Sequence, residues 1–597
     1  MATSYPRADG RNARDAPRAW PYNVQLVEEP RPVSPAVPAA APLAGTLLGL
    51  AALLVGLLTV VLWWPLRRAD ILPPDRAVLA AAAADAGRWP AAELAGWLRD
   101  SRGPLTRVLL AAEFRAWSDG VPAMRTVALA FHAGSALVLV ILIAQLANVL
   151  QPRAPLRLSG VALVAALAAF LYALHPQRAA ALTSLAGHGV PVATAAALLA
   201  ALLQVASWTV RRPGPARCAA AALMIVSLLA SAAAAAVPLV LVALDALRRR
   251  SLMAALRDGA VPLLATCGAW LLALFLLHGP PEALERPDDL RDTAPALTPA
   301  AHLAVGVRGL AQHALAAVWP PLLPTSSDAV QPVALLSRAY GGPLLGLLGV
   351  LGLIAATARH APAIAVALAS VLLIAGPPIL LGRPGRTAAS PLDGALPAAA
   401  AAAALGVLIA RLAPAAPPWR RLARAAGCAA LLAAAAGAAL GTRREVATRA
   451  DSLKWWAAVE QSGRGTSRTG RAWLYYAYAR TLEETGELER AIQLYQAALA
   501  ARPTLLEAHV RLWGAYFAAG EYRAAYNLSA GALSRWPGEP VVRYLLGAAA
   551  AALCDLPTAE MHLRWAAERA PHEPRYRAAL AALPRPPTAP TTSDAPP

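Results

Sequence analysis

Lysine is almost absent from this chain of 597 residues. Of its 54 lysine and arginine residues, Lys454 is the only lysine, so arginine carries almost all of the formal net charge of +19. Most of these arginines lie in short stretches between long apolar runs, which is typical of loop charge in membrane proteins. The charge therefore does not indicate nucleic-acid binding, and we expect no nucleic-acid partner.

Cysteine is also scarce. The chain has four cysteines: Cys218, Cys267, Cys428 and Cys554. No two of them have the spacing of metal ligands, and nothing in their arrangement suggests a disulfide framework. The first three lie in apolar runs and the last in a soluble helix pattern, so we expect small packing residues.

Apolar sequence is abundant. The chain is 58% hydrophobic with a mean hydropathy of +0.47, too apolar for one soluble domain. Several runs of about 20 apolar residues are long enough to span a bilayer. The run from Leu43 to Leu66 follows a polar, Pro/Arg-rich segment and is longer than the core of a signal peptide. These features predict a polytopic membrane protein surrounded by membrane lipids.

The apolar runs predict about 11 membrane spans. The predicted spans lie near 43–65, 124–149, 158–174, 190–209, 218–232, 234–246, 259–277, 342–358, 361–381, 394–413 and 422–440. The stretch 218–246 is either one long helix or two short helices broken near Pro238. The segment 301–319 is apolar on one face but carries two histidines and an arginine, which favours an interfacial or re-entrant helix.

Loop charge predicts the orientation of these spans, because cytoplasmic loops carry an excess of arginine and lysine. With eleven spans, the arginine-rich N-terminus and the most basic loops are cytoplasmic. The opposite side receives 66–123, 175–189, the acidic 279–300, 382–393 and everything after 441. The heavy use of Ala, Arg and Pro is typical of GC-rich bacterial genomes. We therefore expect a bacterial inner-membrane protein with a cytoplasmic N-terminus and an extracytoplasmic C-terminal domain.

An internal repeat begins after Gly441, where the composition changes. Residues of one kind recur every 34 positions: Pro503, Pro537 and Pro571; Ala491, Ala525 and Ala559; Ala498, Ala532 and Ala566. This period is that of tetratricopeptide repeats, in which small alanines let paired helices approach and prolines follow the second helix of a unit. Three units are about the minimum for a stacked core.

Two further positions of each repeat predict its turn and its core. Gly486 and Gly520 mark the turn between the two helices, and Cys554 replaces the glycine in the third unit. The large apolar position of the first helix is filled by Tyr478, Leu512 and Leu546. The repeats either bind a peptide or protein partner in a concave groove or form a rigid cap without a ligand.

The predicted fold class is therefore all-α, a polytopic helical bundle followed by an α-solenoid. Its parts are a disordered basic segment over 1–42, a membrane domain over 43–441, a junction over 442–470, three repeats over 471–580 and a disordered Pro/Thr-rich tail over 581–597.

Features of the first half of the chain follow a specific order. A first span leads into "WWPLRRADILPPD", the next span reads "RTVALAFHAGSALVLVIL", and a later one ends in "FLYALHPQRAAALTSLAGHG". The part of this last stretch after His175-Pro176 predicts a helix that is too short and too polar to cross a bilayer. This order resembles the transmembrane and tetratricopeptide-repeat O-mannosyltransferases of the C-type (GT-C) glycosyltransferase superfamily. The stretch "RREVATRADSLKWWAAVEQSG", 443–463, resembles that family's junction between the last span and the first repeat.

The resemblance implies that a sugar passes from a polyprenyl phosphate to a protein or glycan acceptor presented by the repeats. It implies a general base or divalent-metal ligand at Asp70 and a second catalytic residue at His175. Its implied substrate-binding residues are Arg178, His188, Arg383, Arg386 and His132. No cofactor is certain, and a divalent metal ion is the one candidate.

The chain departs from this family at several charged positions. The first loop opens with Asp70 alone, where the family has adjacent acidic residues, and the segment after His175 has no acidic residue. Asp70 could instead pair with the neighbouring Arg67 and Arg68. His175 could simply end a helix, His132 could join two helices by a hydrogen bond, and the arginines near 383 could flank a span.

These departures keep other functions open. The chain is an active glycosyltransferase, or a catalytically degenerate scaffold whose repeats recruit envelope proteins, or a transporter of a lipid-linked intermediate. The last function is disfavoured because the spans show no paired carboxylates for proton coupling.

Overall fold

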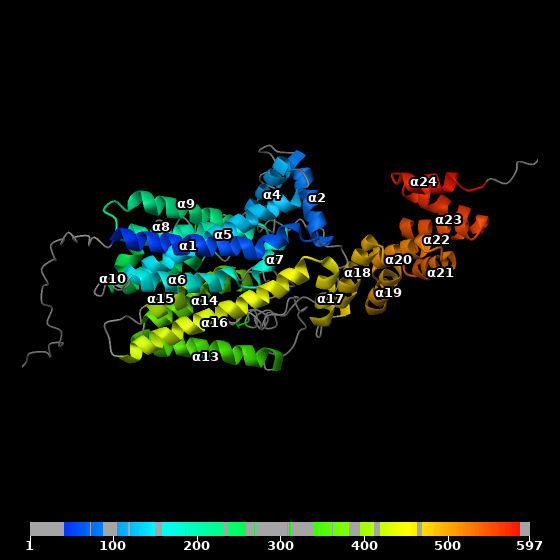
Figure 1. The fold of residues 1–597 in the computed structure, drawn as a ribbon. Helices are drawn as coiled ribbons and strands as arrows, with labels where there is room; N and C mark the ends of the chain where they lie inside the picture. Colours follow the sequence, from blue (N-terminus) through cyan, green and yellow to red (C-terminus); the bar gives the residue numbers. More distant parts are fainter. Residues whose placement is uncertain are drawn as a thin grey trace, which may run out of the picture.

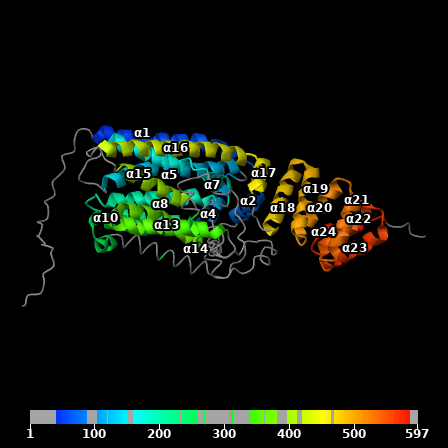
Figure 2. The same ribbon diagram turned by 90° about the horizontal axis from the view of Figure 1, so that it is seen from below.

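The structure, a computed structural model, describes residues 41–71, 73–87, 104–117, 120–149, 158–185, 187–230, 234, 236–257, 268, 307, 310–311, 338–360, 362–380, 395–410, 418–462 and 468–584. Over these residues every regular element is a helix and no strand occurs, as predicted. A helical bundle and a stack of shorter helices lie end to end (Figures 1 and 2).

Long helices form the bundle, and each coincides with a predicted span. They are α1 (Ala41–Trp63), α5 (Val121–Val149), α6 (Leu158–Ala173), α8 (Gly189–Ser207), α9 (Gly214–Ala230), α10 (Val237–Arg249), α13 (Arg338–His360), α14 (Pro362–Leu380), α15 (Ala395–Ala410) and α16 (Pro418–Arg449). The predicted span 259–277 and the segment 301–319 lie almost wholly outside the described residues.

Four helical stretches of the described part are long and apolar enough to cross a membrane. They are Gly45–Arg68, Val121–Val149, Gly189–Ser207 and Arg421–Arg449. Shorter apolar helices lie beside them in the bundle: Gly160–Ala173, Gly214–Ala230, Leu344–Arg359, Ile364–Ala375 and Ala395–Ala410. Because a spanning helix needs about 20 residues, the structure supports membrane association but does not confirm about eleven spans.

The stretch 218–246 forms two helices. Helix α9 ends at Ala230 and α10 begins at Val237, so that Pro238 occupies the first turn of α10. Proline is tolerated there because the first-turn N–H groups have no partner within the helix.

Small residues let the central helices pack closely. A methyl group on Gly406 of α15 would lie 2.9 Å from both Ala168 of α6 and Ile143 of α5. Such close approach at small residues is a usual means of helix association in membranes. The packing makes α15 a neighbour of both α5 and α6.

Short helices gather at the end of the bundle next to the stack, which we term the proximal end. They are η1 (Trp64–Arg68), α2 (Pro73–Gly87), α4 (Pro104–Trp117) and α7 (Arg178–Thr183). Helix α1 begins at the opposite, distal end (Figure 1). All four short helices belong to segments that the loop charges assign to the extracytoplasmic side.

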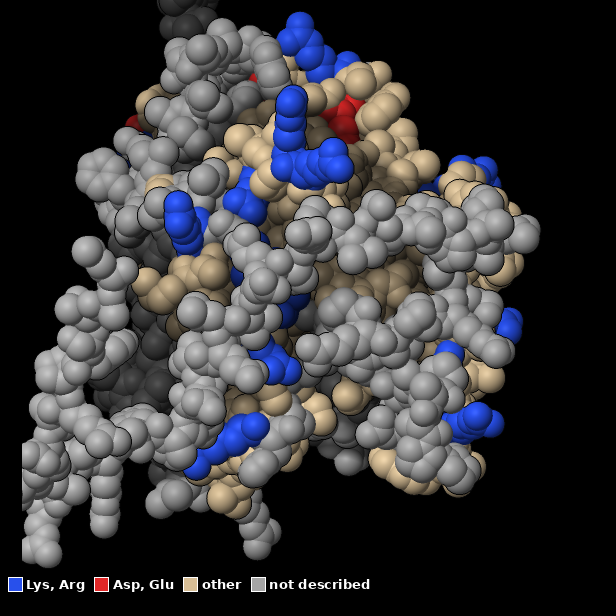
Figure 3. Space-filling view, turned by 90° about the vertical axis from the view of Figure 1, so that its left-hand side faces the viewer, with Lys and Arg blue, Asp and Glu red and all other residues tan. Residues whose placement is uncertain are grey.

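Arginines gather at the distal end (Figure 3). They lie next to the ends of α8, α9 and α10 and at the start of α16: Arg211, Arg212, Arg217, Arg248, Arg249, Arg250, Arg257, Arg421 and Arg424. These arginines come from the loops predicted to be cytoplasmic, so the predicted loop sides correspond to two physical ends of the bundle. Which end faces the cytoplasm stays a prediction.

The stack contains the predicted repeats. Its helices are α18 (Arg468–Thr485), α19 (Leu488–Ala501), α20 (Leu506–Ala518), α21 (Tyr522–Leu533), α22 (Pro540–Ala552), α23 (Leu556–Arg569) and α24 (Pro574–Ala581). The repeated alanines and the large residues Tyr478, Leu512 and Leu546 are all buried.

The turns within the repeats need a left-handed backbone. Gly486 has φ +86° and Gly520 has φ +78°, and Cys554 at the equivalent position of the third unit has φ +65°. Glycine adopts this conformation without a Cβ clash, whereas cysteine does not. The predicted turn positions are therefore confirmed, and Cys554 is the strained member of the set.

Candidate functional site

The segment from Leu174 to His188, which we term the corner, joins α6 to α8 at the proximal end. Helix α6 ends just before His175-Pro176, and proline prevents the helix from continuing. The short helix predicted after this pair is α7. All six residues of α7 are buried, so the corner lies under neighbouring elements.

Arg178 is a buried cation in this corner. Its side chain is only 2% exposed, and none of its three guanidinium nitrogens has a hydrogen-bond partner among the described residues. The guanidinium carbon lies 6.0 Å from the ring centre of Tyr172. Burial lowers the pKa of Arg178 to about 10, so the group remains charged at neutral pH. Because an unpaired buried charge costs several kcal/mol, this position favours an anion.

His132 is accounted for by contacts between helices. Its Nε2 lies 3.1 Å from the carbonyl oxygen of Ala173, which only accepts, so Nε2 carries the proton. The hydroxyl of Tyr172 lies 3.4 Å from Nδ1, and the indole of Trp63 donates to the same Ala173 oxygen at 2.8 Å. The helix-joining role left open for His132 thus matches the structure, and a substrate role stays a prediction.

The other two histidines of the site are also buried. His175 is the second residue after the end of α6, and its backbone N–H donates to the Tyr172 carbonyl at 3.3 Å. His188 Nε2 lies 2.7 Å from Oε2 of Glu113 on α4, and both side chains are at most 5% exposed. The acidic residue missing from the corner is therefore supplied by α4, which no local sequence pattern revealed.

Close packing brings α4 against the start of α8. A methyl group on Gly189 would lie 1.9 Å from the hydroxyl oxygen of Thr106, so a side chain at this position would displace α4. Glycine next to His188 therefore permits the approach of Glu113.

Asp70 is exposed and lies just after η1. Its Oδ2 accepts a hydrogen bond from the backbone N–H of Ser452 at 2.9 Å. Among the described residues, Arg67 packs over the ring of Trp64 at 4.0 Å, and no ion pair joins Asp70 to Arg67 or Arg68. The local salt bridge, the alternative left open for Asp70, is therefore not formed, and Asp70 instead contacts a residue 382 positions away.

Arg125 is a second buried arginine, and sequence reasoning did not single it out. It is 3% exposed in the first turns of α5. Its Nε donates to the Thr183 carbonyl and its Nη2 to the Asp70 carbonyl, each at 3.1 Å, while Nη1 donates to Ala69. A charged residue inside a predicted span was the available signal.

The remaining predictions concern Arg383, Arg386 and a metal ion. Arg383 and Arg386 lie outside the described residues. No cluster of three or more His, Cys, Asp or Glu that could hold a metal ion occurs in the described part of the chain. The divalent metal ion considered at Asp70 therefore stays a prediction.

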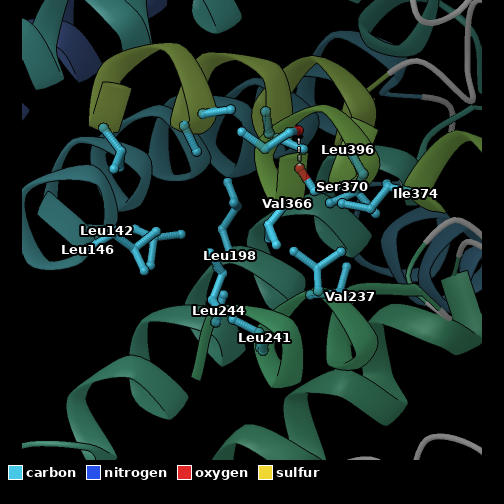
Figure 4. Close-up of a pocket in the computed structure, with 18 of the residues that line it drawn as sticks. Leu142, Leu146, Leu198, Val237, Leu241, Leu244, Val366, Ser370, Ile374 and Leu396 are labelled. Atoms are coloured by element: carbon cyan, nitrogen blue, oxygen red, sulfur yellow. Dashed lines mark hydrogen bonds between the residues drawn. The ribbon is translucent and has the colours of Figure 1, made fainter. Parts of the chain in front are cut away.

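An apolar cavity of about 120 Å³ lies within the bundle (Figure 4). Helices α5, α8, α10, α14 and α15 supply its walls, which include Leu142, Leu198, Leu241 and Leu396. Ser370 is the only polar side chain among the described residues that line it, and its hydroxyl donates to Ala367 at 2.7 Å. Helix α15 therefore lines the cavity while it also packs against α6, which leads into the corner.

The comparisons with known proteins support the repeats. A family model described as tetratricopeptide repeat matches residues 516–583, which include α21 to α24. No curated protein and no solved structure matches the chain. The resemblance of the membrane domain to glycosyltransferases thus stays a prediction.

Proposed function

We propose that this chain is an integral membrane glycosyltransferase of the C-type kind, built on about eleven spans. In this proposal it takes a sugar from a polyprenyl phosphate at the proximal end and transfers it to a protein or glycan acceptor near the repeats. The observation that carries the proposal is Arg178, a buried cation without a hydrogen-bond partner among the described residues.

A lipid-linked phosphate suits this position for two reasons. A guanidinium binds phosphate oxygens through paired, charge-assisted hydrogen bonds, and desolvation strengthens them. A polyprenyl donor also needs an apolar path for its chain beside a polar end. Helix α15, which lines the apolar cavity, also packs against α6, the helix that leads into the corner. We therefore assign the donor phosphate to Arg178 and a segment of the prenyl chain to the cavity.

The transfer itself needs a base and a stabilised leaving group. The acceptor hydroxyl attacks the anomeric carbon, the bond from this carbon to the phosphate oxygen breaks, and the hydroxyl proton passes to a base. Asp70 is the proposed base, because its carboxylate is exposed and one of its oxygens is not used by Ser452. Arg178 stabilises the charge that develops on the phosphate.

The remaining predicted residues have supporting parts in this proposal. His175 and His188 belong to the corner, where the proposal places the donor headgroup. Arg383 and Arg386 follow α14 in the chain and add positive charge for the phosphate. His132 holds α6 in place through Ala173.

Release of the lipid tests the proposal. The full-length chain in nanodiscs is given polyprenyl-phosphate mannose or glucose and a Ser/Thr-rich peptide, and released polyprenyl phosphate is measured. We expect Arg178→Met to slow release at least about 100-fold, as loss of a principal electrostatic contact does. Arg564→Met, at an exposed ion pair in the repeats, is the matched control and should have no effect. Equal rates for Arg178→Met and the wild type would contradict the phosphate site at Arg178, and no release by the wild type would contradict an enzyme.

A second candidate function is a membrane-anchored scaffold for envelope proteins. It is favoured by Asp70, whose carboxylate contacts the junction to the repeats. In that case deletion of 471–580 abolishes function in cells, whereas Arg178→Met leaves it intact. The deletion of 471–580 and Arg178→Met, compared in cells, thus separate the two candidates.

A further inference from the structure

Arg125 caps two helices at once. Its guanidinium contacts the carbonyls of Ala69 and Asp70, just after η1, and the carbonyl of Thr183, the last residue of α7. Carbonyls at helix ends lack donors within the helix, and a cation there is favoured by the helix dipole. One buried side chain therefore fixes the first loop to the end of the helix that carries Arg178.

Asp70 extends this connection to the junction. Its backbone carbonyl accepts from Arg125, while its side-chain Oδ2 accepts from the N–H of Ser452, the first residue of α17 (Ser452–Ser462). Asp451 accepts from the next two N–H groups, of Leu453 at 3.0 Å and Lys454 at 3.1 Å. Two aspartates thus accept from the N–H groups of the first turn of α17, which lack partners within the helix.

Contacts continue from the bundle into the repeats. The hydroxyl of Thr442 on α16 donates to the carbonyl of Leu174 in the corner. On the far side of α17, the indole of Trp456 donates to Thr481 at 2.9 Å and stacks on Tyr478 with ring centres 6.4 Å apart. The path from Arg125 to the first repeat is therefore continuous.

We propose that Arg125 and Asp70 are positioning residues that hold the repeat stack in one orientation over the corner. Asp70 acts here as a cap of α17 through an acceptor oxygen, not through its negative charge. This inference does not depend on sugar transfer, since it requires only that the two parts of the chain be held together.

Two substitutions of Asp70 separate capping from proton transfer. Asp70→Asn keeps an acceptor oxygen, and Asn caps helices as well as Asp does. Asp70→Ala removes the acceptor. Hydrogen exchange is measured on the full-length chain in nanodiscs. We expect Asp70→Ala to speed exchange at the start of α17 about fivefold, as loss of a cap does, and Asp70→Asn to leave exchange unchanged.

Arg125 is tested in the same way. Arg125→Met should speed exchange in both α7 and the first turn of α17, whereas Asp70→Ala affects α17 alone. Asp555→Ala is the matched control, because Asp555 caps α23 by accepting from Thr558 at 3.3 Å. It should speed exchange in α23 and leave α7 and α17 unchanged.

A variant that removes the contact with Asp70 but keeps α17 folded separates loss of the contact from misfolding. Ser452→Pro removes the N–H that Asp70 binds, yet proline is favoured at the first position of a helix. Spin labels are placed on Arg115→Cys of α4 and on the exposed Cys554, with the other cysteines replaced by alanine. The label distance should be narrowly distributed in the wild type and in Asp70→Asn, and broad in Ser452→Pro and Asp70→Ala.

Two results would overturn the inference. One is unchanged exchange and unchanged label distances in Asp70→Ala and Ser452→Pro, which would mean that the contact carries no positional constraint. The other is an Asp70→Asn variant as loose as Asp70→Ala, which would mean that charge and not the acceptor oxygen is what matters.

Discussion

The corner and the repeat stack differ in the buried charge that they hold. In the stack, the hydroxyl of Tyr495 donates to Glu483 at 2.6 Å, and Trp456 donates to Thr481. In the corner, Arg178 is buried without a hydrogen-bond partner among the described residues. The stack also buries groups without a hydrogen-bond partner in the described part of the chain, but they include neutral ones such as the indole N–H of Trp473 and of Trp513. An unpaired buried charge costs more than an unpaired neutral group, so the corner keeps a costly charge that a ligand can compensate.

The buried pair next to the corner gives the largest expected effect on stability. Glu113→Ala leaves His188 without its partner, and breaking a buried pair costs about 3–5 kcal/mol. The thermal unfolding of the detergent-solubilised chain should shift strongly downwards. The double variant Glu113→Leu/His188→Leu should recover most of the loss, because apolar replacement of both partners is often neutral. A double variant as unstable as the single one would contradict a simple ion pair.

Truncation in the core of the stack should act on the repeats alone. Leu512→Ala removes a side chain that is 2% exposed, which costs about 2–5 kcal/mol. Hydrogen exchange should rise across the stack, while binding of polyprenyl phosphate to the corner stays unchanged. Weaker lipid binding in this variant would show that the two regions are not separable.

The strained turn of the third repeat offers a stabilising change. Cys554→Gly should stabilise the repeats by about 1 kcal/mol, because glycine adopts φ +65° without a Cβ clash. Gly520→Ala, at the equivalent turn, should destabilise them by about the same amount. Exchange rates in α22 and α23 measure the first change and those in α20 and α21 the second. Destabilisation by Cys554→Gly would mean that its thiol makes a compensating contact.

The smallest expected effect is a pH dependence of the stack. Burial lowers the pKa of His509 from its usual 6.5, and burial with Arg543 nearby lowers that of His562. The unfolded chain therefore binds protons more readily, so stability should be complete above about pH 6.5 and fall as the pH drops below it. The free energy of unfolding, measured by chemical unfolding between about pH 5 and 8, should therefore decrease towards low pH. His509→Gln should make this decrease smaller. A stability that rises as the pH falls would have the wrong sign.

The same contrast explains what the sequence could predict. The 34-residue period identified the turns at Gly486 and Gly520 and the core at Leu512, because each unit contacts only its neighbours and repeats its pattern. The stop at His175-Pro176 and the short helix after it were equally local. The burial of α7 was not local, because η1, α5, α8 and α16 pack against it.

The contacts of the corner could not be predicted in this way. Glu113 with His188 and Asp70 with Ser452 join residues from segments that share no pattern, and the second pair is 382 residues apart. Only Arg125 carried a signal, as a charge inside a predicted span. An alternative that the sequence offered for Asp70, a salt bridge with its neighbours, was wrong because Asp70 faces the junction.

Stability and lipid binding of a single variant test the central claim most directly. Thermal unfolding of the wild type and of Arg178→Met is compared in nanodiscs with and without polyprenyl phosphate. Replacement of an unpaired buried charge by an apolar side chain should raise stability without lipid by about 1–4 kcal/mol, and the lipid should stabilise only the wild type. An Arg178→Met variant that is less stable than the wild type and equally stabilised by the lipid would contradict an anion site at the corner.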